Sequence, residues 1–342
     1  NFQDTLLDDE ATTSINQGDA PFNGTFKPEG AGGLAVFKGE NPTGTWTLSV
    51  TDTYLPEDDG TLFKVGDAAP WGGAIGTQLL IRTPITGESG SINLNATNGS
   101  ISVGNLNTNG LTGNTDVTLR ATNDIQIDGN VTNPGGVVFL TNQYQSNLAG
   151  DIRVSRIDTT NRSGDGGAIT IDSRGDIFST ELLSASGAFV EEFGFPEPDP
   201  NFNQNPGNGG AIILMAQGNI VSQDIVSGSY SGGGDTGDGG EIRLSAGNDI
   251  TFGDNSQVLS ESWSDSGNAG DGGDISFIGG DISFGDDSWV FSSSSSFEGN
   301  AGDGGDISLG GGDISFGDNS LVSSYSLSLE GNTGDGGEIS LG

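Results

Sequence analysis

The sequence predicts an all-β protein whose main part is a parallel β-helix (solenoid), and three observations support this prediction. First, the segment starting at Gly270, GDGGDISFIGGDISFGDDSWVF, returns at Gly302 as GDGGDISLGGGDISFGDNSLV and at Gly334 as GDGGEISL, each time after 32 residues. A fixed period of this length is typical of repeat architectures. Second, apolar residues within each copy alternate with Ser, Asp or Thr, which is the strand pattern. Third, Gly-Asp-Gly-Gly and Gly-Asp-Asn groups separate these runs and predict turns.

Equivalent apolar positions recur one period apart, so stacked copies would place like residues on like residues. The columns are Ile275, Ile307 and Ile339; Ile250, Ile282 and Ile314; Phe252, Phe284 and Phe316; and Val258, Val290 and Val322. One copy cannot bury its own apolar face, but copies stacked one strand spacing apart, roughly 4.8 Å, can. We therefore expect three short strands per coil, roughly eight to ten coils from residue 87 on, and a rod of about 40–50 Å.

The composition excludes several classes of function. The 342 residues include no Cys and no His, and the formal net charge is -37. Without His, this chain alone cannot form a Ser-His-Asp triad, a Cys-His pair or a His-ligated zinc site. No Lys or Arg follows Arg243, which argues against nucleic acid and anionic membranes as partners and favours cations or basic partners. No apolar run is long enough to predict a membrane span.

Residues 1–83 differ from the repeats in composition. Thr45–Val50 alternates as a strand, with predicted turns at Asn41–Gly44 and Glu57–Gly60. The motifs of this part are D-T-x-x-D-D-E-A at Asp4–Ala11, G-T-F-x-P at Gly24–Pro28, L-x-x-F-x-G at Leu34–Gly39, N-P-x-G-x-W-x-L-x-V-x-D at Asn41–Asp52 and D-G-x-L at Asp59–Leu62.

These motifs resemble the P domain (P/Homo B domain) that follows the catalytic domain of kexin-like and other subtilisin-type proteases. The resemblance implies a jelly-roll β-sandwich, of which only the C-terminal half is present. One departure is that Phe63–Gly76 stands where the family usually has a Trp shortly after D-G-x-L. The predicted domains are residues 1–83 as this partial jelly roll, 84–90 as a linker and 91–342 as the β-helix, with its repeats clearest from residue 237.

The G-D-G-G-x-I repeats resemble the β-helical repeats of filamentous haemagglutinin-like adhesins, particularly large secreted proteins of cyanobacteria. This resemblance covers most of the chain and implies the β-helical architecture more firmly than any one activity. Within the repeats, Glu191–Pro206 is rich in Pro and interrupts the period. We expect it to be a loop that protrudes from the β-helix.

Two groups of acidic residues are candidate calcium sites. Asp271, Asp303 and Asp335 should stack one coil apart, where neighbouring carboxylates repel by roughly 1 kcal/mol even in water. Ca²⁺, which takes oxygen ligands, would relieve that repulsion. The alternative is that Asp and Gly simply form turns. In the first part of the chain, the P-domain resemblance implies a calcium-supported loop at Asp52, Asp58 and Asp59, whereas Glu-Asp-Asp-Gly forms a turn without any metal.

A serine-rich run, Ser292–Ser296, lies near Trp263, Trp289 and Tyr325. Aromatic side chains on the solvent face of a polar sheet could stack on sugars, although such residues more often cap or fill a core. An acidic-pair glycosidase is a further hypothesis, but nothing in the sequence distinguishes such a pair among so many stacked acids.

We expect a non-catalytic piece of a large secreted or cell-surface bacterial protein, in which the β-helix acts as stalk and binding surface for a protein or glycan. The alternative is the C-terminal accessory region of a secreted subtilisin-like serine endopeptidase, whose catalytic domain would lie upstream. The chain starts at Asn1 without Met, which we interpret as a fragment of a longer polypeptide.

Overall fold

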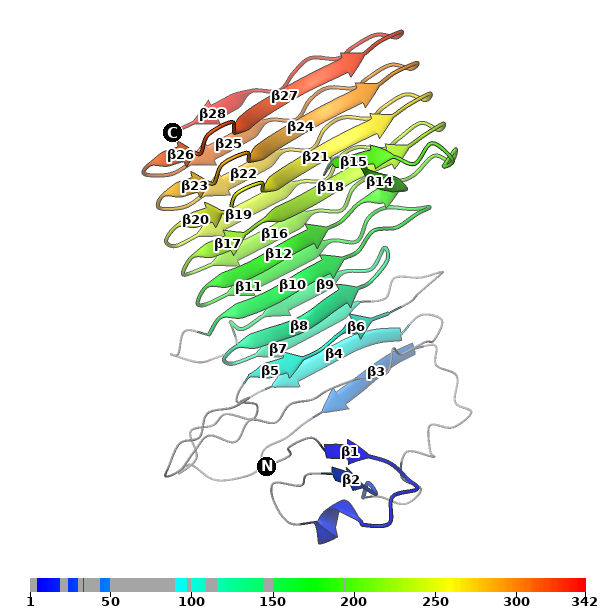
Figure 1. The fold of residues 1–342 in the computed structure, drawn as a ribbon, viewed down its shortest axis with the longest axis vertical. Coiled ribbons are helices and arrows are strands. Elements are labelled where there is room, and N and C mark those ends of the chain that lie inside the picture. The colour runs from blue at the N-terminus through cyan, green and yellow to red at the C-terminus, as the bar shows by residue number, and fades with distance from the viewer. Residues whose placement is uncertain are drawn as a thin grey trace.

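The computed structural model describes residues 5–18, 24–29, 33, 44–49, 90–96, 100–108, 116–143, 150–192 and 195–342. Within these ranges the chain is nearly all β, and its helical element is the short 3-10 turn η1 (Ile15–Gln17). From β4 onward the chain winds into stacked coils whose strands run parallel to their neighbours (Figure 1). This arrangement agrees with the predicted parallel β-helix.

One sheet takes a single strand from every coil. Along the axis its strands are β3 (Gly44–Ser49), β4 (Gly90–Ala96), β7 (Val117–Ala121), β9 (Val138–Thr141), β11 (Ile169–Ser173), β16 (Ile212–Ala216), β19 (Ile242–Ala246), β22 (Ile275–Ile278), β25 (Ile307–Gly310) and β28 (Ile339–Leu341). Nine of these ten strands lie in residues 90–342, so the number of coils agrees with the expected eight to ten.

A second sheet takes the other strands of the coils. In the regular coils each coil adds a short strand and a long one: the short strands are β17 (Ile220–Ser222), β20 (Ile250–Phe252), β23 (Ile282–Phe284) and β26 (Ile314–Phe316), and the long strands are β18 (Asp224–Ser231), β21 (Gln257–Ser264), β24 (Trp289–Ser296) and β27 (Leu321–Ser328). Earlier coils contribute β5 (Ile101–Val103), β6 (Leu106–Asn107), β8 (Ile125–Thr132), β10 (Ile152–Asp158), β12 (Ile177–Leu183) and β13 (Ser186–Gly187). Three strands per regular coil is the predicted number.

The residues of each predicted column are paired with one another in the structure. Ile275 pairs with Ile307 and Ile307 with Ile339, and the other three columns pair likewise. The rings of Phe252 and Phe284 stack with centroids 4.8 Å apart and planes 2° apart. Full burial of each such side chain stabilises the fold by roughly 1.5–3 kcal/mol, and most of the buried apolar residues form one continuous core inside the coils.

The turn between the short and long strands has the same backbone shape in three successive coils. Asn255, Asp287 and Asn319 have φ values of 58°, 56° and 59°. Asn and Asp tolerate this left-handed conformation better than other residues with a Cβ. The Gly-Asp-Asn and Gly-Asp-Asp groups therefore form a specific bend and are not merely polar spacers.

After Val258 and Val290, which belong to the main core, the inner side of β21 and β24 carries serine instead of apolar residues. Ser260 Oγ donates a hydrogen bond to the carbonyl of Gly240 at 2.7 Å, and Ser292 Oγ to that of Gly273 at 2.8 Å. These glycines belong to the Gly-Asp-Gly-Gly segment that returns toward the next coil. A single serine side chain fills the space between the long strand and the return segment. A Cβ on Gly273 would therefore be 2.6 Å from Ser260 Oγ. This close approach explains why the return segment is so rich in glycine.

The first 83 residues are described only in part. β1 (Thr5–Leu7) pairs in parallel with β2 (Gly24–Phe26). The strand expected at residues 45–50 is present as β3, and it pairs in parallel with β4 of the β-helix, with Gly44 opposite Gly90. Gly90, expected in the linker, begins β4. Neither described pairing is antiparallel as a jelly roll requires, so the jelly roll stays a prediction, and residues 50–89, with Asp52, Asp58 and Asp59, lie outside the described residues.

The Pro-rich interruption contains more structure than expected. β14 (Phe189–Glu192) and β15 (Phe195–Pro198) form an antiparallel hairpin, and β15 contacts β18 and β21. Pro196 and Pro198 are compatible with an edge strand because their missing N–H groups are not needed for a second pairing. The prediction of a protruding loop was therefore wrong: part of the segment is a hairpin that lies against the coils.

Across the described part of the chain, no helix combines the length and the apolar character needed to cross a membrane.

The approach of the return segment to the long strands predicts a contrast between two glycines. Gly273→Ala should lower the free energy of unfolding by about 1–3 kcal/mol, because its Cβ would overlap Gly240 and Ser260. Gly253→Ala should change it by less than about 1 kcal/mol, because a Cβ there meets nothing within 4 Å. Urea unfolding of both variants measures the difference, and equal effects would contradict the packing described.

Candidate functional site

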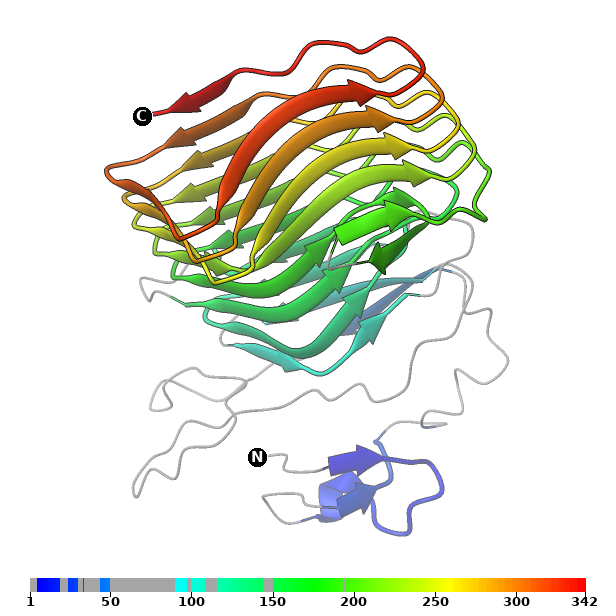
Figure 2. The same ribbon diagram turned by 45° about the horizontal axis from the view of Figure 1, so that its top comes forward.

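The outward side chains of the long strands β18, β21, β24 and β27 form the candidate site, here called the outer face. Serines that alternate with them point inward to the return segment, so the intervening residues point outward. Between β18 and β24 these are Val226, Gly228 and Tyr230; Gln257, Leu259, Glu261 and Trp263; and Trp289, Phe291, Ser293 and Ser295. The long strands bow so that this outer side is concave (Figure 2).

A second, smaller core lies on the outer face. Leu183, Val226 and Leu259 are buried there with Phe291 packed against them, apart from the core inside the coils. The hairpin also contributes, because the Phe189 ring lies 5.2 Å from the Tyr230 ring. Tyr230 is completely buried. The concave shape and the hairpin explain how outward residues of a single sheet become inaccessible to solvent.

Glu261 is a buried carboxyl group in the middle of the outer face, with 7% of its surface exposed. The Tyr230 hydroxyl donates to its Oε2 at 3.4 Å, and the Ser293 hydroxyl donates to its Oε1 at 3.3 Å. Desolvation by burial raises the pKa of Glu261 to about 7, although both hydrogen bonds act in the opposite direction. Burial, reinforced by the charge of Glu261, raises the pKa of Tyr230 as well. Glu261 thus changes charge near neutral pH.

The backbone beneath Glu261 is adapted to this arrangement. Gly228 precedes Glu261 in its column, and the ring of Tyr230 folds back over it, so that a Cβ at Gly228 would lie 2.5 Å from the Tyr230 hydroxyl. One coil further, Ser293 and then Tyr325 occupy the same column. Sequence reasoning missed Glu261, and the available signal was that it is the single acid in a column of Gly, Ser and Tyr.

Aromatic rings flank this polar centre on both sides. Trp263 and Phe297 meet edge to face with centroids 6.1 Å apart, and Trp289 and Phe291 lie 5.6 Å apart. Phe297 is 39% exposed, and the other three rings are half-buried. For Trp263 and Trp289, the sequence left open whether they fill the core or face solvent. Both lie outside the main core, each in contact with a phenylalanine ring and each partly exposed to solvent.

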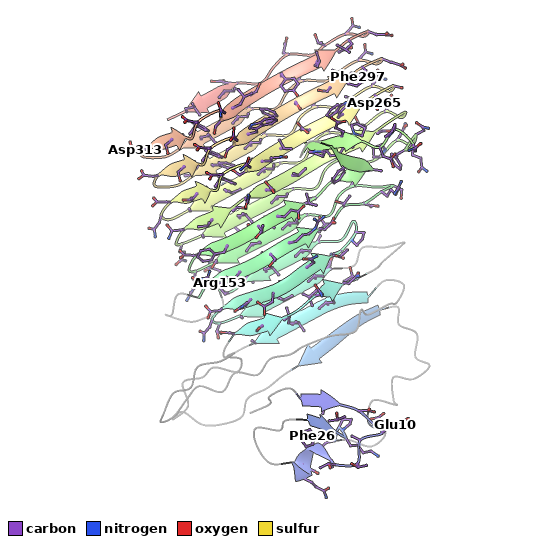
Figure 3. The ribbon with its side chains drawn as sticks, in the orientation of Figure 1. Glu10, Phe26, Arg153, Asp265, Phe297 and Asp313 are labelled. Carbon is purple, nitrogen blue, oxygen red and sulfur yellow. The ribbon has the colours of Figure 1, made fainter. Side chains whose placement is uncertain are left out.

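The carboxylates at the ends of the long strands repel one another. Burial raises the pKa of Asp265, and the charges of Glu197 on the hairpin and Glu298 in the next coil raise it further. Figure 3 shows Asp265 and Phe297 at the same end of the long strands, with Asp313 at the opposite edge of the coils. The rim of the outer face is therefore acidic.

The predicted acidic column forms a hydrogen-bonded ladder. The backbone N–H of Asp303 donates to Asp271 Oδ1 at 2.8 Å, and that of Asp335 donates to Asp303 Oδ1 at 2.8 Å. Asp271 itself bonds Asp238 in the same way. Each carboxylate therefore accepts an N–H from the next coil in a charge-assisted hydrogen bond, which offsets repulsion within the column.

The same ladder occurs at other turns. Equivalent bonds join Asp281 to Asp249, Asp286 to Asp254, Asp306 to Asp274 and Asn300 to Asn268, all one coil apart. Asn serves as well as Asp in one of these columns, so the side-chain acceptor, not its charge, is what the ladder needs. Among the described residues no group of three or more acidic, His or Cys side chains is arranged to hold a metal ion, and calcium remains a proposal.

Comparison of the chain with protein-family models, curated proteins and solved structures finds no match. The resemblances to P domains and to haemagglutinin-like repeats therefore stay predictions from the sequence motifs.

Glu261 should make the stability of the fold depend on pH. Its pKa of about 7 lies above the value of 4.5 expected in the unfolded chain, so the folded state holds the proton more tightly. Its contribution to stability is present below about pH 4.5 and is lost as the pH rises to about 7, by up to roughly 3 kcal/mol.

Glu261→Gln removes this loss. The variant should be more stable than the parent at about pH 8 and differ little from it at about pH 4, as measured by urea unfolding at both values. If the difference in the free energy of unfolding between parent and variant is the same at both pH values, Glu261 is not a buried carboxyl group that titrates in this range.

The acidic column yields a separate prediction about calcium. If the column of Asp271, Asp303 and Asp335 binds Ca²⁺, millimolar CaCl₂ should raise the melting temperature more than NaCl at equal ionic strength. Asp303→Asn keeps the ladder acceptor but removes one charge, so it should retain the fold and reduce the calcium-specific increase. Equal effects of the two salts on the parent protein would rule out calcium at this column.

Proposed function

We propose that this chain is a non-catalytic part of a large secreted bacterial surface protein, in which the β-helix acts as a rigid stalk that presents a binding surface on its side. The observation that carries the proposal is the uninterrupted register from β4 to β28, in which each strand of the first sheet pairs with the next. A stalk must hold its length under load, and a stack paired coil to coil does so better than flexibly linked domains.

Columns of several kinds support a stiff stack. Backbone ladders, stacked Ile and Phe side chains, serine-to-glycine bonds and Asp or Asn ladders act at different places around each coil. Because they are spread around the circumference, bending in any direction stretches at least one of them. The lateral surface would then be held at a defined position along the stalk.

The alternative function, an accessory region of a subtilisin-like serine endopeptidase, is supported by the motif N-P-x-G-x-W-x-L-x-V-x-D at Asn41–Asp52. In that case the β-helix would anchor or space a catalytic domain. Sequencing the gene on the 5′ side of the Asn1 codon distinguishes the two: an encoded Asp-His-Ser protease domain would support the accessory role, and encoded β-helix or binding modules would support the surface protein.

The stalk proposal predicts that one whole coil can be removed. Deleting residues 270–301 joins Ala269 to Gly302, which restores the local sequence Ala-Gly-Asp-Gly-Gly. The deleted protein should fold and be shorter by about one strand spacing, roughly 4.8 Å, in small-angle X-ray scattering. As a control, deleting residues 270–285 removes half a coil, breaks the register and should unfold the C-terminal coils. Loss of structure in the whole-coil deletion would count against an extendable stalk.

A further inference from the structure

We propose that the outer face binds a neutral glycan chain across two aromatic pairs, Trp289 with Phe291 and Trp263 with Phe297. The inference rests on the proposed function, because it identifies the lateral binding surface of the stalk and its class of ligand. Trp289 and Phe291 lie on β24, and the second pair joins Trp263 of β21 to Phe297, which follows β24, so all four rings come from two adjacent coils in the interior of the stack. Their partial exposure is therefore a property of the concave face itself.

The chemistry of the face suits a sugar. A pyranose ring has a face of C–H groups that stacks on an aromatic ring, and hydroxyl groups around its edge that need hydrogen-bond partners. The four half-buried or exposed rings provide the stacking surface. Carboxylates at the rim, Asp265 and Glu298, lie beside the Trp263 and Phe297 pair and are good acceptors for sugar hydroxyls.

The charge of the face excludes anionic glycans. The chain has no Lys or Arg after Arg243, so β21, β24 and their neighbouring turns have no cation to pair with a uronic acid or a sulfated sugar. Burial raises the pKa of Asp265, and the charges of Glu197 and Glu298 raise it further. An added anion there would be repelled further.

A peptide or protein partner fits less well. An extended peptide binds a sheet at a free edge, but β21 and β24 are paired with neighbours on both sides. Protein interfaces have an apolar centre and a polar rim. Here Ser293, Ser295 and Glu261 lie between the two ring pairs, so polar groups divide the apolar surface that a protein partner would need at the centre.

The outer face already holds one ring that comes from outside the coils. Phe189 of the hairpin packs on Tyr230, which is directly opposite Trp263 in the pairing of β18 with β21. The aromatic surface beyond the hairpin continues this contact. A ligand there would extend an interface that the protein forms with its own chain.

Binding can be measured with the full chain and short neutral oligosaccharides of β-glucan, mannan and N-acetylglucosamine, followed by tryptophan fluorescence and calorimetry. We expect at least one of them to bind, and oligogalacturonate not to bind. Binding that prefers oligogalacturonate, or no binding to any neutral oligosaccharide, would overturn the proposal. Scattering of the same samples reports the stalk separately, so a failed ligand and a failed stalk are distinguishable.

The repeat itself supplies variants that should fold. Trp289→Gln and Phe291→Ser introduce the residues that adjacent coils have at the same positions, Gln257 and Ser323. Each should weaken binding by about tenfold or more, equivalent to ~1.4 kcal/mol.

The matched control is Phe139→Thr on β9, in the other sheet, which copies its neighbours Thr118 and Thr170. This variant should bind as the parent does. If the outer-face variants bind as tightly as the control, the ligand lies elsewhere and the assignment is wrong.

Discussion

Hydrogen bonding between successive coils at a constant register is the constraint on which the rest of this structure depends. Each strand within the stack forms backbone hydrogen bonds to a parallel strand on either side. Each coil must therefore place its N–H and C=O groups opposite those of the next coil. This requirement explains why Ile follows Ile and Phe follows Phe from coil to coil. In the last coils the turns also keep one length, because all three strands of a coil pair with residues 32 positions further along the chain.

The acidic composition is compatible with this stack because many of the carboxylates act as acceptors. Column formation should make a chain with a net charge of -37 repel itself. Instead, Asp238, Asp271 and Asp303 each accept a backbone N–H from the following coil. At these turns, where the strands end, Asp side chains thereby accept the backbone N–H groups of the next coil, which would otherwise lack a partner. The outer face differs, because the buried carboxyl group of Glu261 accepts hydrogen bonds from the hydroxyls of Tyr230 and Ser293 and not from a backbone N–H of the next coil.

The repeat alone predicted the coil, its three strands and the positions of the core columns, because these depend on a two-residue alternation and a constant period. It could not predict the burial of Glu261. Alternation places this residue outward but does not show that the long strands bow or that Phe189 packs nearby. Likewise, the pairing of Thr45 opposite Ser91 joins segments far apart in sequence, and no local pattern encodes it. The Pro-rich hairpin was missed because its Pro residues are tolerated only by its edge position.

Amide hydrogen exchange at the corners of the coils tests the central claim most directly. The N–H groups of Asp286 and Asp303 lie in exposed turns and would exchange quickly if turns merely connected strands. Since each donates to an Asp of the preceding coil, we predict protection comparable to that of the neighbouring strand amides Phe284 and Ile307. Exchange at the rate of an unstructured peptide, with the strand amides still protected, would contradict a stack joined all the way around its coils.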